Sequence, residues 1–151
     1  MIIRKATTDD IRTIAAFQQK MAYETERLEL DSEVLLEGVG NVFRDPSKGF
    51  YLVAQEKESI IASMLLTPEW SDWRNSLFLW IQSLYVIPAY RRKGVFRMMY
   101  DHVQQMVRES DGYAGIKLYV DQGNERAQEA YRRVGMKASH YNLFEWNKFN
   151  Y

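Results

Sequence analysis

Three strand-like segments follow one another in the middle of the chain, with no helical pattern between them. They are FYLVAQ (50–55), IIASMLLT (60–67) and LFLWIQSLYV (77–86), all rich in β-branched, aromatic and leucine residues. The polar connection EKES joins the first two, which predicts a β-hairpin. Pro88 ends the third segment, because proline has no N–H to donate to a strand ladder. The block therefore predicts a sheet built around consecutive strands.

Helical patterns flank this block on both sides. TTDD offers N-cap residues before an apolar spacing that starts at Ile11. A second helix is expected from Ser32 until RDPSKG breaks it. A third is expected over about 95–110, and a fourth begins at the N-cap Asn124 and stops at Gly135.

Further strands are expected outside the block. MIIRKA (1–6) and GIKLYV (115–120) each indicate one strand, and the tail MKASHYNLFEWN (136–147) indicates one or two more. The predicted order is strand, two helices, three strands, helix, strand, helix and one or two strands. This order is typical of an α/β layered domain with a mixed sheet.

The composition excludes several classes of protein. The length of 151 residues indicates one domain over 1–151. Lys and Arg together number 20, as do Asp and Glu, and this balance argues against a nucleic-acid partner. Without cysteine there is no disulfide and no thiol nucleophile, and the two histidines lack a metal-ligand spacing. No metal site is therefore expected.

The sequence also carries no membrane signal. MIIRKATTDD lacks a signal-peptide pattern, because charge arrives at Arg4 before any long apolar run. No apolar run is long enough to cross a bilayer. We therefore expect a cytoplasmic protein with no membrane partner. The aromatic content of 14% is enough for a pocket or a dimer surface, so a homodimer stays open.

A cationic loop precedes the third predicted helix. Arg91, Arg92, Lys93 and Arg97 lie within seven residues, with Gly94 among them. The first N–H groups of a helix lack internal partners and, with the macrodipole, favour an anion. Glycine lets the backbone approach a phosphate closely. The pattern predicts an anion site, with a solvated basic loop as the alternative, since the Walker and dinucleotide glycine spacings are absent.

A second motif, NERAQEAYRRVGM, begins thirty residues after that glycine. It contains Asn124, Ala127, Tyr131 and Gly135. Together with RRKGVF, it resembles the GNAT family of acetyl-CoA-dependent N-acetyltransferases. The family's loop reads Gln/Arg-x-x-Gly-x-Gly/Ala, and its later motif reads Asn-x2-Ala-x3-Tyr-x3-Gly-Phe. Here Met136 replaces the last Phe, and Phe96 stands where the loop has a small residue.

The resemblance implies a fold and a cosubstrate. The fold is a mixed, mostly antiparallel central sheet of six to seven strands flanked by about four helices. The cosubstrate is acetyl-CoA, with no metal. The residues implied to bind it are Leu84, Tyr85 and Val86 beside the pantetheine arm, Arg91, Arg92, Lys93, Gly94, Val95, Phe96 and Arg97 around the pyrophosphate, and Asn124 at the pantetheine amides.

The resemblance also implies how protons move. Tyr131 is expected to be the general acid near the thioester sulfur, with a core aromatic residue as the alternative. A phenol has a pKa of about 10 against about 8.5 for a thiol, so this tyrosine should help modestly. Glu24 and Glu26 are candidates for the base that deprotonates the acceptor amine, with a solvated acidic face as the alternative.

An acceptor site facing the thioester is also expected. Trp70 and Trp73 are expected to form its wall, and Gln82 to lie in it; packing of the rings on the sheet or a dimer surface is the alternative. The acids of YETERLELDSE favour a cationic acceptor. The implied function is direct acetyl transfer, in a ternary complex, to a primary amine of a small molecule. Acetylation of a protein lysine or N-terminus, and a non-catalytic acyl-CoA-binding module, stay open.

Overall fold

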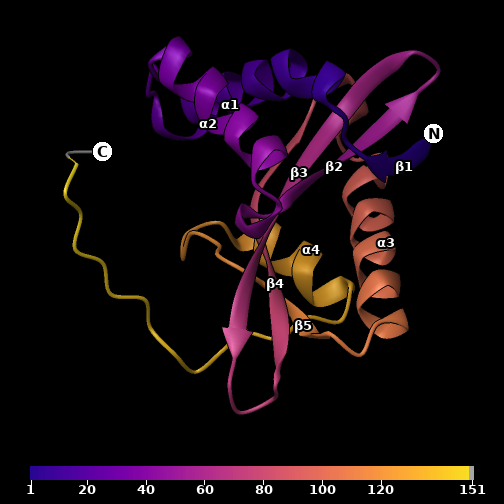
Figure 1. Ribbon diagram of the computed structural model, residues 1–151, viewed down its shortest axis with the longest axis vertical. Helices are drawn as coiled ribbons and strands as arrows, with labels where there is room; N and C mark the ends of the chain where they lie inside the picture. The colour runs from indigo at the N-terminus through magenta and orange to yellow at the C-terminus, as the bar shows by residue number, and fades with distance from the viewer. Residues whose placement is uncertain (150–151) are drawn as a thin grey trace. The chain divides into compact units, whose positions relative to one another are not determined.

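One sheet of five strands organises the first 119 residues of the protein (Figure 1). The structure, a computed structural model, describes residues 1–149 and consists of two units, Met1–Tyr119 and a second that starts at Val120. The strand order is β1-β2-β3-β4-β5, antiparallel except for the parallel pair β4 and β5. The strands are β1 (Ile2–Lys5), β2 (Phe50–Glu56), β3 (Ser59–Ser71), β4 (Ser76–Val86) and β5 (Tyr113–Leu118).

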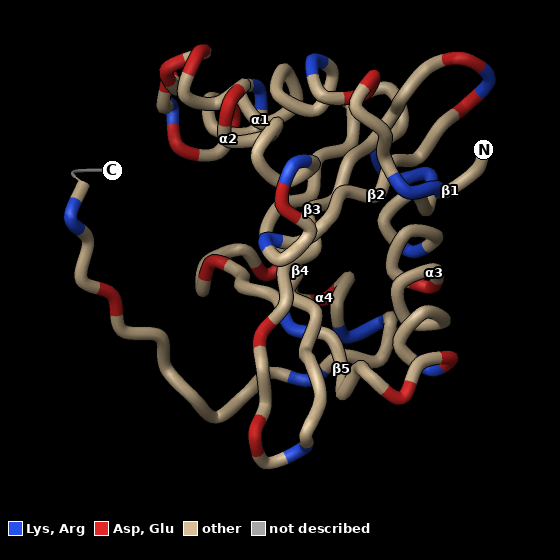
Figure 2. Tube along the Cα trace, in the orientation of Figure 1, with Lys and Arg blue, Asp and Glu red and all other residues tan. Residues whose placement is uncertain are grey.

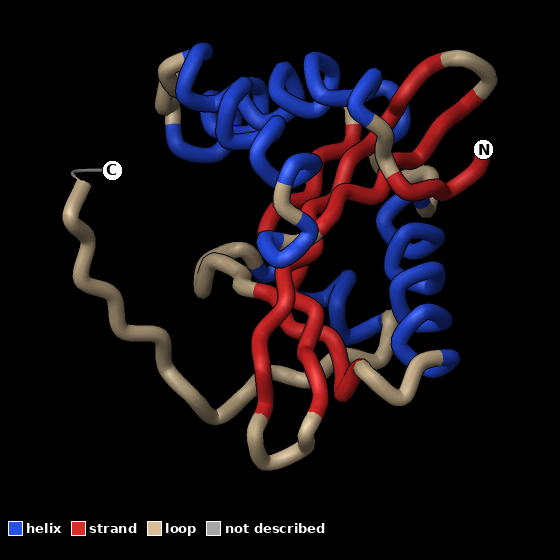
Figure 3. The backbone as a smooth tube through the Cα atoms, in the orientation of Figure 1, coloured by secondary structure: helices blue, strands red, loops and turns tan. Residues whose placement is uncertain are grey.

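The central hairpin is longer than the sequence predicts. β3 continues through PEWS to Ser71, and its pairing with β4 runs from Ala62 opposite Val86 to Ser71 opposite Ser76. Most of the segment expected as a loop is therefore strand, because cross-strand pairing outweighs the local preference of proline and polar residues for a turn. Figure 3 shows these two strands continuing past the helices of the first unit.

Helices cover both faces of this sheet. α1 (Ile11–Glu26) and α2 (Ser32–Arg44) pack on one face, and α3 (Val95–Glu109) contacts β1, β2 and β5. On the first face a buried cluster contains Ile14, Ala15 and Val39 from the helices and Tyr51 and Val53 from β2.

The other residues of β2 face the opposite side of the sheet. Leu52 and Ala54 alternate with Tyr51 and Val53, so their side chains point away from α1 and α2. They are almost completely buried, as are Met99 and Val103 of α3. Met99 and Val103, four residues apart on α3, therefore belong to the core of the second layer.

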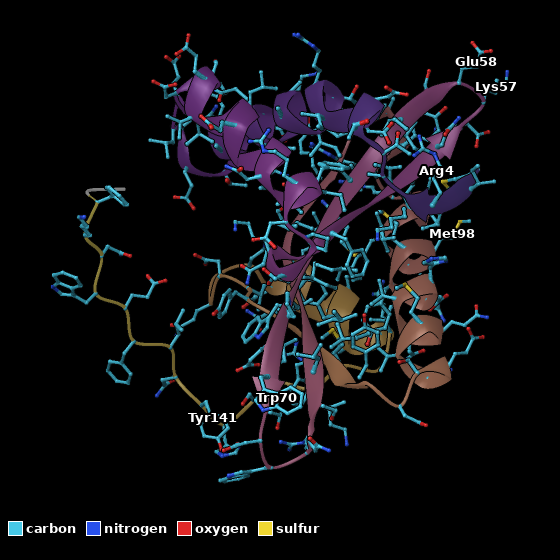
Figure 4. The ribbon with its side chains drawn as sticks, viewed as in Figure 1. Arg4, Lys57, Glu58, Trp70, Met98 and Tyr141 are labelled. Atoms are coloured by element: carbon cyan, nitrogen blue, oxygen red, sulfur yellow. The ribbon has the colours of Figure 1, made fainter. Side chains whose placement is uncertain are left out.

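The start of α1 is held by a buried carboxylate. Asp10 is 7% exposed and accepts two hydrogen bonds from the Arg4 guanidinium, at 2.8 and 3.0 Å, and one from the Thr7 N–H at 2.8 Å. Arg4 also donates to Gln55 of β2 (Figure 4). The predicted N-cap segment TTDD thus forms a short 3₁₀ turn over Thr8–Asp10, from which α1 continues.

Residues 120–149 of the second unit contain one helix, α4 (Glu125–Arg133). Asn124 is its N-cap, as predicted, and its side-chain oxygen accepts a hydrogen bond from the Ala127 N–H at 3.1 Å. The chain turns at Gly135, which has a φ of 91°. This end is the C-terminal stop that the sequence indicates.

The strands predicted in the tail are absent from the described part of the chain. Residues 136–149 contain no strand, so the described sheet has five strands instead of six or seven. The physical reason is pairing: a strand is stabilised by cross-strand neighbours, and no described strand pairs with this segment. Its large side chains are exposed, with Tyr141 at 75%, Phe144 at 91% and Trp146 at 89%. Alternation of aromatic residues alone does not make a strand.

The helices of residues 1–149 are all too short or too polar to cross a membrane. Basic and acidic positions are interspersed along the trace (Figure 2), in keeping with the equal numbers of the two charges.

A first prediction concerns Gly49, which precedes β2. Its φ of 128° and ψ of −160° belong to a region that only glycine adopts readily, and an added Cβ would overlap the Leu66 carbonyl oxygen. Gly49→Ala should lower the free energy of unfolding by about 3 kcal/mol or more, from backbone strain and overpacking combined. Gly135→Ala is the control, because an added Cβ meets nothing within 4 Å there. It should cost only about 1–2 kcal/mol. Equal losses in urea unfolding would contradict this account.

A second prediction concerns pH. The hydrogen bonds from Arg4 lower the pKa of Asp10 below its usual 3.8. The ionised form therefore stabilises the fold above about pH 4, and this contribution is lost as the pH falls through the lowered folded-state pKa. Asp10→Asn should cost about 2 kcal/mol at pH 7 and clearly less at pH 3, measured by urea unfolding. Asp9→Asn, at the exposed neighbour, should show no such pH-dependent difference. A constant cost for Asp10→Asn across this range would refute the prediction.

Candidate active site

β4 loses one of its two neighbours halfway along its length. It pairs with β3 from end to end, but its pairing with β5 stops at Ile81 opposite Leu118. At the same point Gln82 has no partner on β3, because Leu65 lies opposite Ser83 and Leu66 opposite Ile81. Such a bulge bends a strand and increases its twist. The bulge thus coincides with the place where β4 and β5 separate.

Beyond the bulge, β4 presents backbone groups that no described strand uses. The Ile87 N–H donates to the Ile61 carbonyl of β3, so Tyr85, two residues earlier, also points its backbone toward β3. Leu84 and Val86 alternate with it, and their N–H and C=O groups point to the side that β5 has left. Of the three β4 residues predicted to pair with a pantetheine arm, Leu84 and Val86 have the backbone orientation that such pairing needs.

The chain then turns into α3 at a glycine. Gly94 has a φ of 77°, precedes the first helical residue Val95, and has open space where a Cβ would be. No side chain caps the helix, and its first backbone bond runs from the Met98 N–H to the Gly94 carbonyl. The α-helical pattern of backbone bonds thus begins at Met98, and the turn before it is the helix end that carries the positive pole of the helix dipole. An anion is the natural complement of such an end.

The side chains of the first helical turn point in different directions. Val95 is 2% exposed and belongs to the core, so its predicted role in cofactor binding can rest only on its N–H. The Phe96 ring packs against Tyr100 in the next turn, with centroids 5.9 Å apart. The Phe96 ring thus packs along α3, although the family's loop has a small residue at this position.

The four cations of the loop are not equivalent. Arg97 faces Asp101 one turn along α3, with 3.8 Å between charged atoms, and Lys93 lies over the Tyr90 ring at 5.1 Å. Arg92 is exposed and has a φ of 63°, which is unusual for a residue with a side chain. Such strained positions cluster at ligand-binding sites. Arg92 and Lys93 are therefore the cations best placed for an anion at the helix end.

Arg91 is engaged elsewhere. Its Nη2 lies 2.6 Å from Glu24 Oε2, its Nε donates to the Val86 carbonyl at 2.8 Å, and its guanidinium lies over the Tyr85 ring. Glu24 also accepts a hydrogen bond from the Tyr85 hydroxyl at 2.8 Å. This network joins the C-terminal part of α1 to the end of β4. Arg91 is thus tied to the sheet at the base of the cationic loop.

The same network changes the chemistry of Glu24. The hydrogen bond from Tyr85, and then that from Arg91, lower the pKa of the Glu24 carboxyl below its usual range. A carboxylate stabilised in this way is a weaker proton acceptor. Glu26, the last residue of α1, is exposed. The geometry favours a positioning role for Glu24 over that of a base, and the role of Glu26 stays a prediction.

Both tryptophans predicted to line an acceptor site are exposed. Trp70 is 61% exposed near the end of β3 (Figure 4), and Trp73 in the turn is 87% exposed. Gln82 is exposed at the bulge, and the adjacent Ser83 accepts a hydrogen bond from Gln18 of α1 at 3.1 Å. The roles of Trp70, Trp73 and Gln82 in binding an acceptor stay predictions.

Sequence reasoning missed two residues beside the third tryptophan. Trp80 donates to Glu69 at 2.8 Å and packs on Tyr119, and Lys117 also reaches Glu69 at 2.8 Å. The sequence IKLYV contained this information, because Lys117 and Tyr119 are two positions apart and so lie on the same face of an extended segment. The parallel register that places Lys117 opposite Trp80 was not evident from sequence.

Two predicted residues lie in the second unit. The Asn124 side-chain oxygen caps α4, which leaves its amide group to donate elsewhere. Burial raises the pKa of the Tyr131 phenol above its ordinary value, so the hydroxyl stays protonated at neutral pH. Their roles at a cofactor stay predictions. Within residues 1–149 no cluster of three or more potential metal ligands occurs.

Comparison with known proteins gives this geometry a family. The sequence profile of the acetyltransferase (GNAT) family matches residues 8–136. A possible acetyltransferase from Clostridium difficile 630 is 40% identical, with a TM-score of 0.92 over 99% of this chain and 98% of that one. The aminoglycoside N-acetyltransferase AAC(6')-Iy in complex with CoA shares the fold at 12% identity, with a TM-score of 0.78 over 98% of this chain and 95% of that one. No curated protein matches the chain. The family match covers the cationic loop and the Asn124–Gly135 motif, and the chain therefore belongs to the GNAT acetyltransferase family.

Proposed function

We propose that this protein transfers the acetyl group of acetyl-CoA to a primary amine of a small molecule, by direct attack in a ternary complex. The observation that carries the proposal is the free edge of β4 beyond Ile81, which leads directly into the uncapped start of α3. An extended chain with amide groups can pair with such an edge, and an anion can bind at such a helix end. Acetyl-CoA combines both features in one molecule.

The residues present fit this cosubstrate. Leu84 offers its backbone N–H and C=O and Val86 its N–H for the pantetheine amides, and the family motif implies the Asn124 side-chain amide as a further partner. Arg92 and Lys93, with Gly94 and the start of α3, would hold the pyrophosphate. When bound, acetyl-CoA supplies an activated acetyl group on a thioester. The chain's own contribution is to bind it, to orient it and to supply or accept protons.

Proton supply is assigned to Tyr131. Its pKa is raised by burial, so the phenol is a hydrogen-bond donor and a poor source of a full proton. It would stabilise developing charge on the leaving sulfur, a modest contribution.

Proton removal from the amine needs another group. Deprotonating an alkylamine of pKa about 10.4 costs about 4.6 kcal/mol at pH 7. Glu24 is committed to Arg91 and Tyr85, and Gln82 is not a base. We infer a relay through water toward an exposed carboxylate such as Glu26.

The cofactor site predicts a specific loss of CoA affinity. Arg92→Ala combined with Lys93→Ala should weaken CoA binding at least tenfold, since two charge-assisted contacts to phosphate are removed. The affinity for pantetheine without phosphates should change little. Calorimetry with both ligands measures this. Lys48→Ala, which removes an exposed lysine paired with Asp45, is the control and should leave both affinities unchanged. Equal losses for CoA and pantetheine would argue against phosphate recognition at this loop.

The reaction itself is tested by thiol release from acetyl-CoA over a panel of amines, amino acids and lysine peptides. Small cationic amines should be the best acceptors. Tyr131→Phe should reduce kcat about tenfold to a hundredfold, or about 1.4–2.7 kcal/mol, with little change in CoA affinity. The proposal is overturned if lysine peptides win the screen, or if no amine is acetylated although acetyl-CoA binds. An unchanged kcat would make Tyr131 a packing residue only.

A further inference from the structure

A lysine ammonium is held between a carboxylate and two aromatic rings on the β3–β4–β5 surface. Lys117 Nζ lies 2.8 Å from Glu69 Oε2, 4.2 Å from the Phe78 ring centroid and 5.6 Å from that of Trp80. The Trp80 indole N–H donates to the same Glu69 oxygen at 2.8 Å, which fixes both the ring and the carboxylate. Glu69, Phe78 and Trp80 together are called the ammonium cage.

The cage lies on the face of the sheet that α1 and α2 cover farther along. Leu65 packs against the core beneath those helices, and Glu69 follows it on β3 at an even spacing, so the two share a face. Trp80 pairs with Thr67 of the same face, and Lys117 pairs with Trp80. The cage therefore continues the face on which Ser83 contacts α1.

The cage is also close to the free edge of β4. Trp80 precedes the bulge residue Gln82 by two positions, a distance of about 7 Å along a strand. If the thioester lies where the free edge begins, this distance matches the span of a short alkyl chain between two amines. Within the first unit, a group bound in the cage would thus be one such chain away from the reacting atom.

The resident ammonium is exchangeable. The Lys117 and Glu69 side chains are 38% and 43% exposed, and ion pairs at such exposure contribute little net free energy. The cage offers a negative carboxylate and two ring faces, which attract any compact organic cation. Lys117 shows by its own position that a primary ammonium on a flexible alkyl chain fits.

We propose that the ammonium cage anchors the distal ammonium group of a diamine or polyamine acceptor, which displaces Lys117 from Glu69, Phe78 and Trp80. The inference rests on the proposed acetyltransferase function and specifies its acceptor. The near amine of the acceptor is then acetylated while the far one is held in the cage. Lys117 is a resident competitor that a monoamine never needs to displace.

The test compares diaminobutane with butylamine, which has the reacting amine but no second cation. Lys117→Met should raise the ratio of kcat/KM for diaminobutane over butylamine about threefold to thirtyfold, because the competitor is gone. Glu69→Gln should lower the ratio, because the anchor is gone. Lys117→Arg restores a cation and should return the ratio to that of the wild type. Lys48→Met removes another ion-paired lysine, which is more exposed and lies away from the cage, and should leave the ratio unchanged.

Calorimetry with diaminobutane alone separates this inference from the proposed function. Tighter binding by Lys117→Met and weaker binding by Glu69→Gln support the cage even if no amine is acetylated. Acetylation of amines with an unchanged diamine-to-monoamine ratio in both variants overturns the cage and leaves the proposed function standing. If Lys117→Met fails to fold in an unfolding assay, Glu69→Gln decides the matter: a lowered ratio supports the cage and an unchanged ratio overturns it.

Discussion

β4 pairs with β3 along its whole length and with β5 only as far as Ile81, and the candidate site depends on this difference. A central strand normally has both edges satisfied, because unpaired backbone groups are costly when buried. Here the pairing with β5 ends at the bulge residue Gln82, and beyond it the backbone groups of Leu84 and the N–H of Val86 point to the side without β5. The strand then runs into the start of α3, so a backbone-pairing edge and an anion-binding helix end follow each other within ten residues.

The Arg91–Glu24–Tyr85 network ties this edge to the first helix. Arg91 holds the Val86 carbonyl, while Glu24 receives both Arg91 and the Tyr85 hydroxyl. The network engages one cation of the loop and one of the two carboxylates predicted as a base. It thereby separates residues that hold the site in shape from residues free to meet a ligand, which in the loop are Arg92 and Lys93.

A second ion pair, between Lys117 and Glu69, lies on the β3–β4–β5 surface. In the sequence Glu69 directly precedes Trp70, one of the two tryptophans expected to form the wall of a site for a cationic acceptor. In the structure that carboxylate is already paired with Lys117, and Trp80 is fixed by a hydrogen bond to it. The two observations agree on one chemistry, the recognition of an ammonium group. They differ on whether Glu69 is unpaired or already paired with Lys117. In the second case an ammonium group of an acceptor has to displace Lys117.

The sequence by itself determined the four helices, the consecutive central strands, the N-cap Asn124 and the family, because each depends on local spacing or on a short motif. The tail strands were predicted wrongly, because alternation at 136–147 says nothing about whether a partner strand is available. The contact between Arg91 and Glu24 could not be predicted from the sequence either, because 67 residues separate these two side chains, which lie 2.6 Å apart in the structure. Only the tertiary structure decided which cations stay free, where β4 leaves β5, and that Lys117 meets Glu69. These outcomes depend on strand register and long-range packing, which no local pattern encodes.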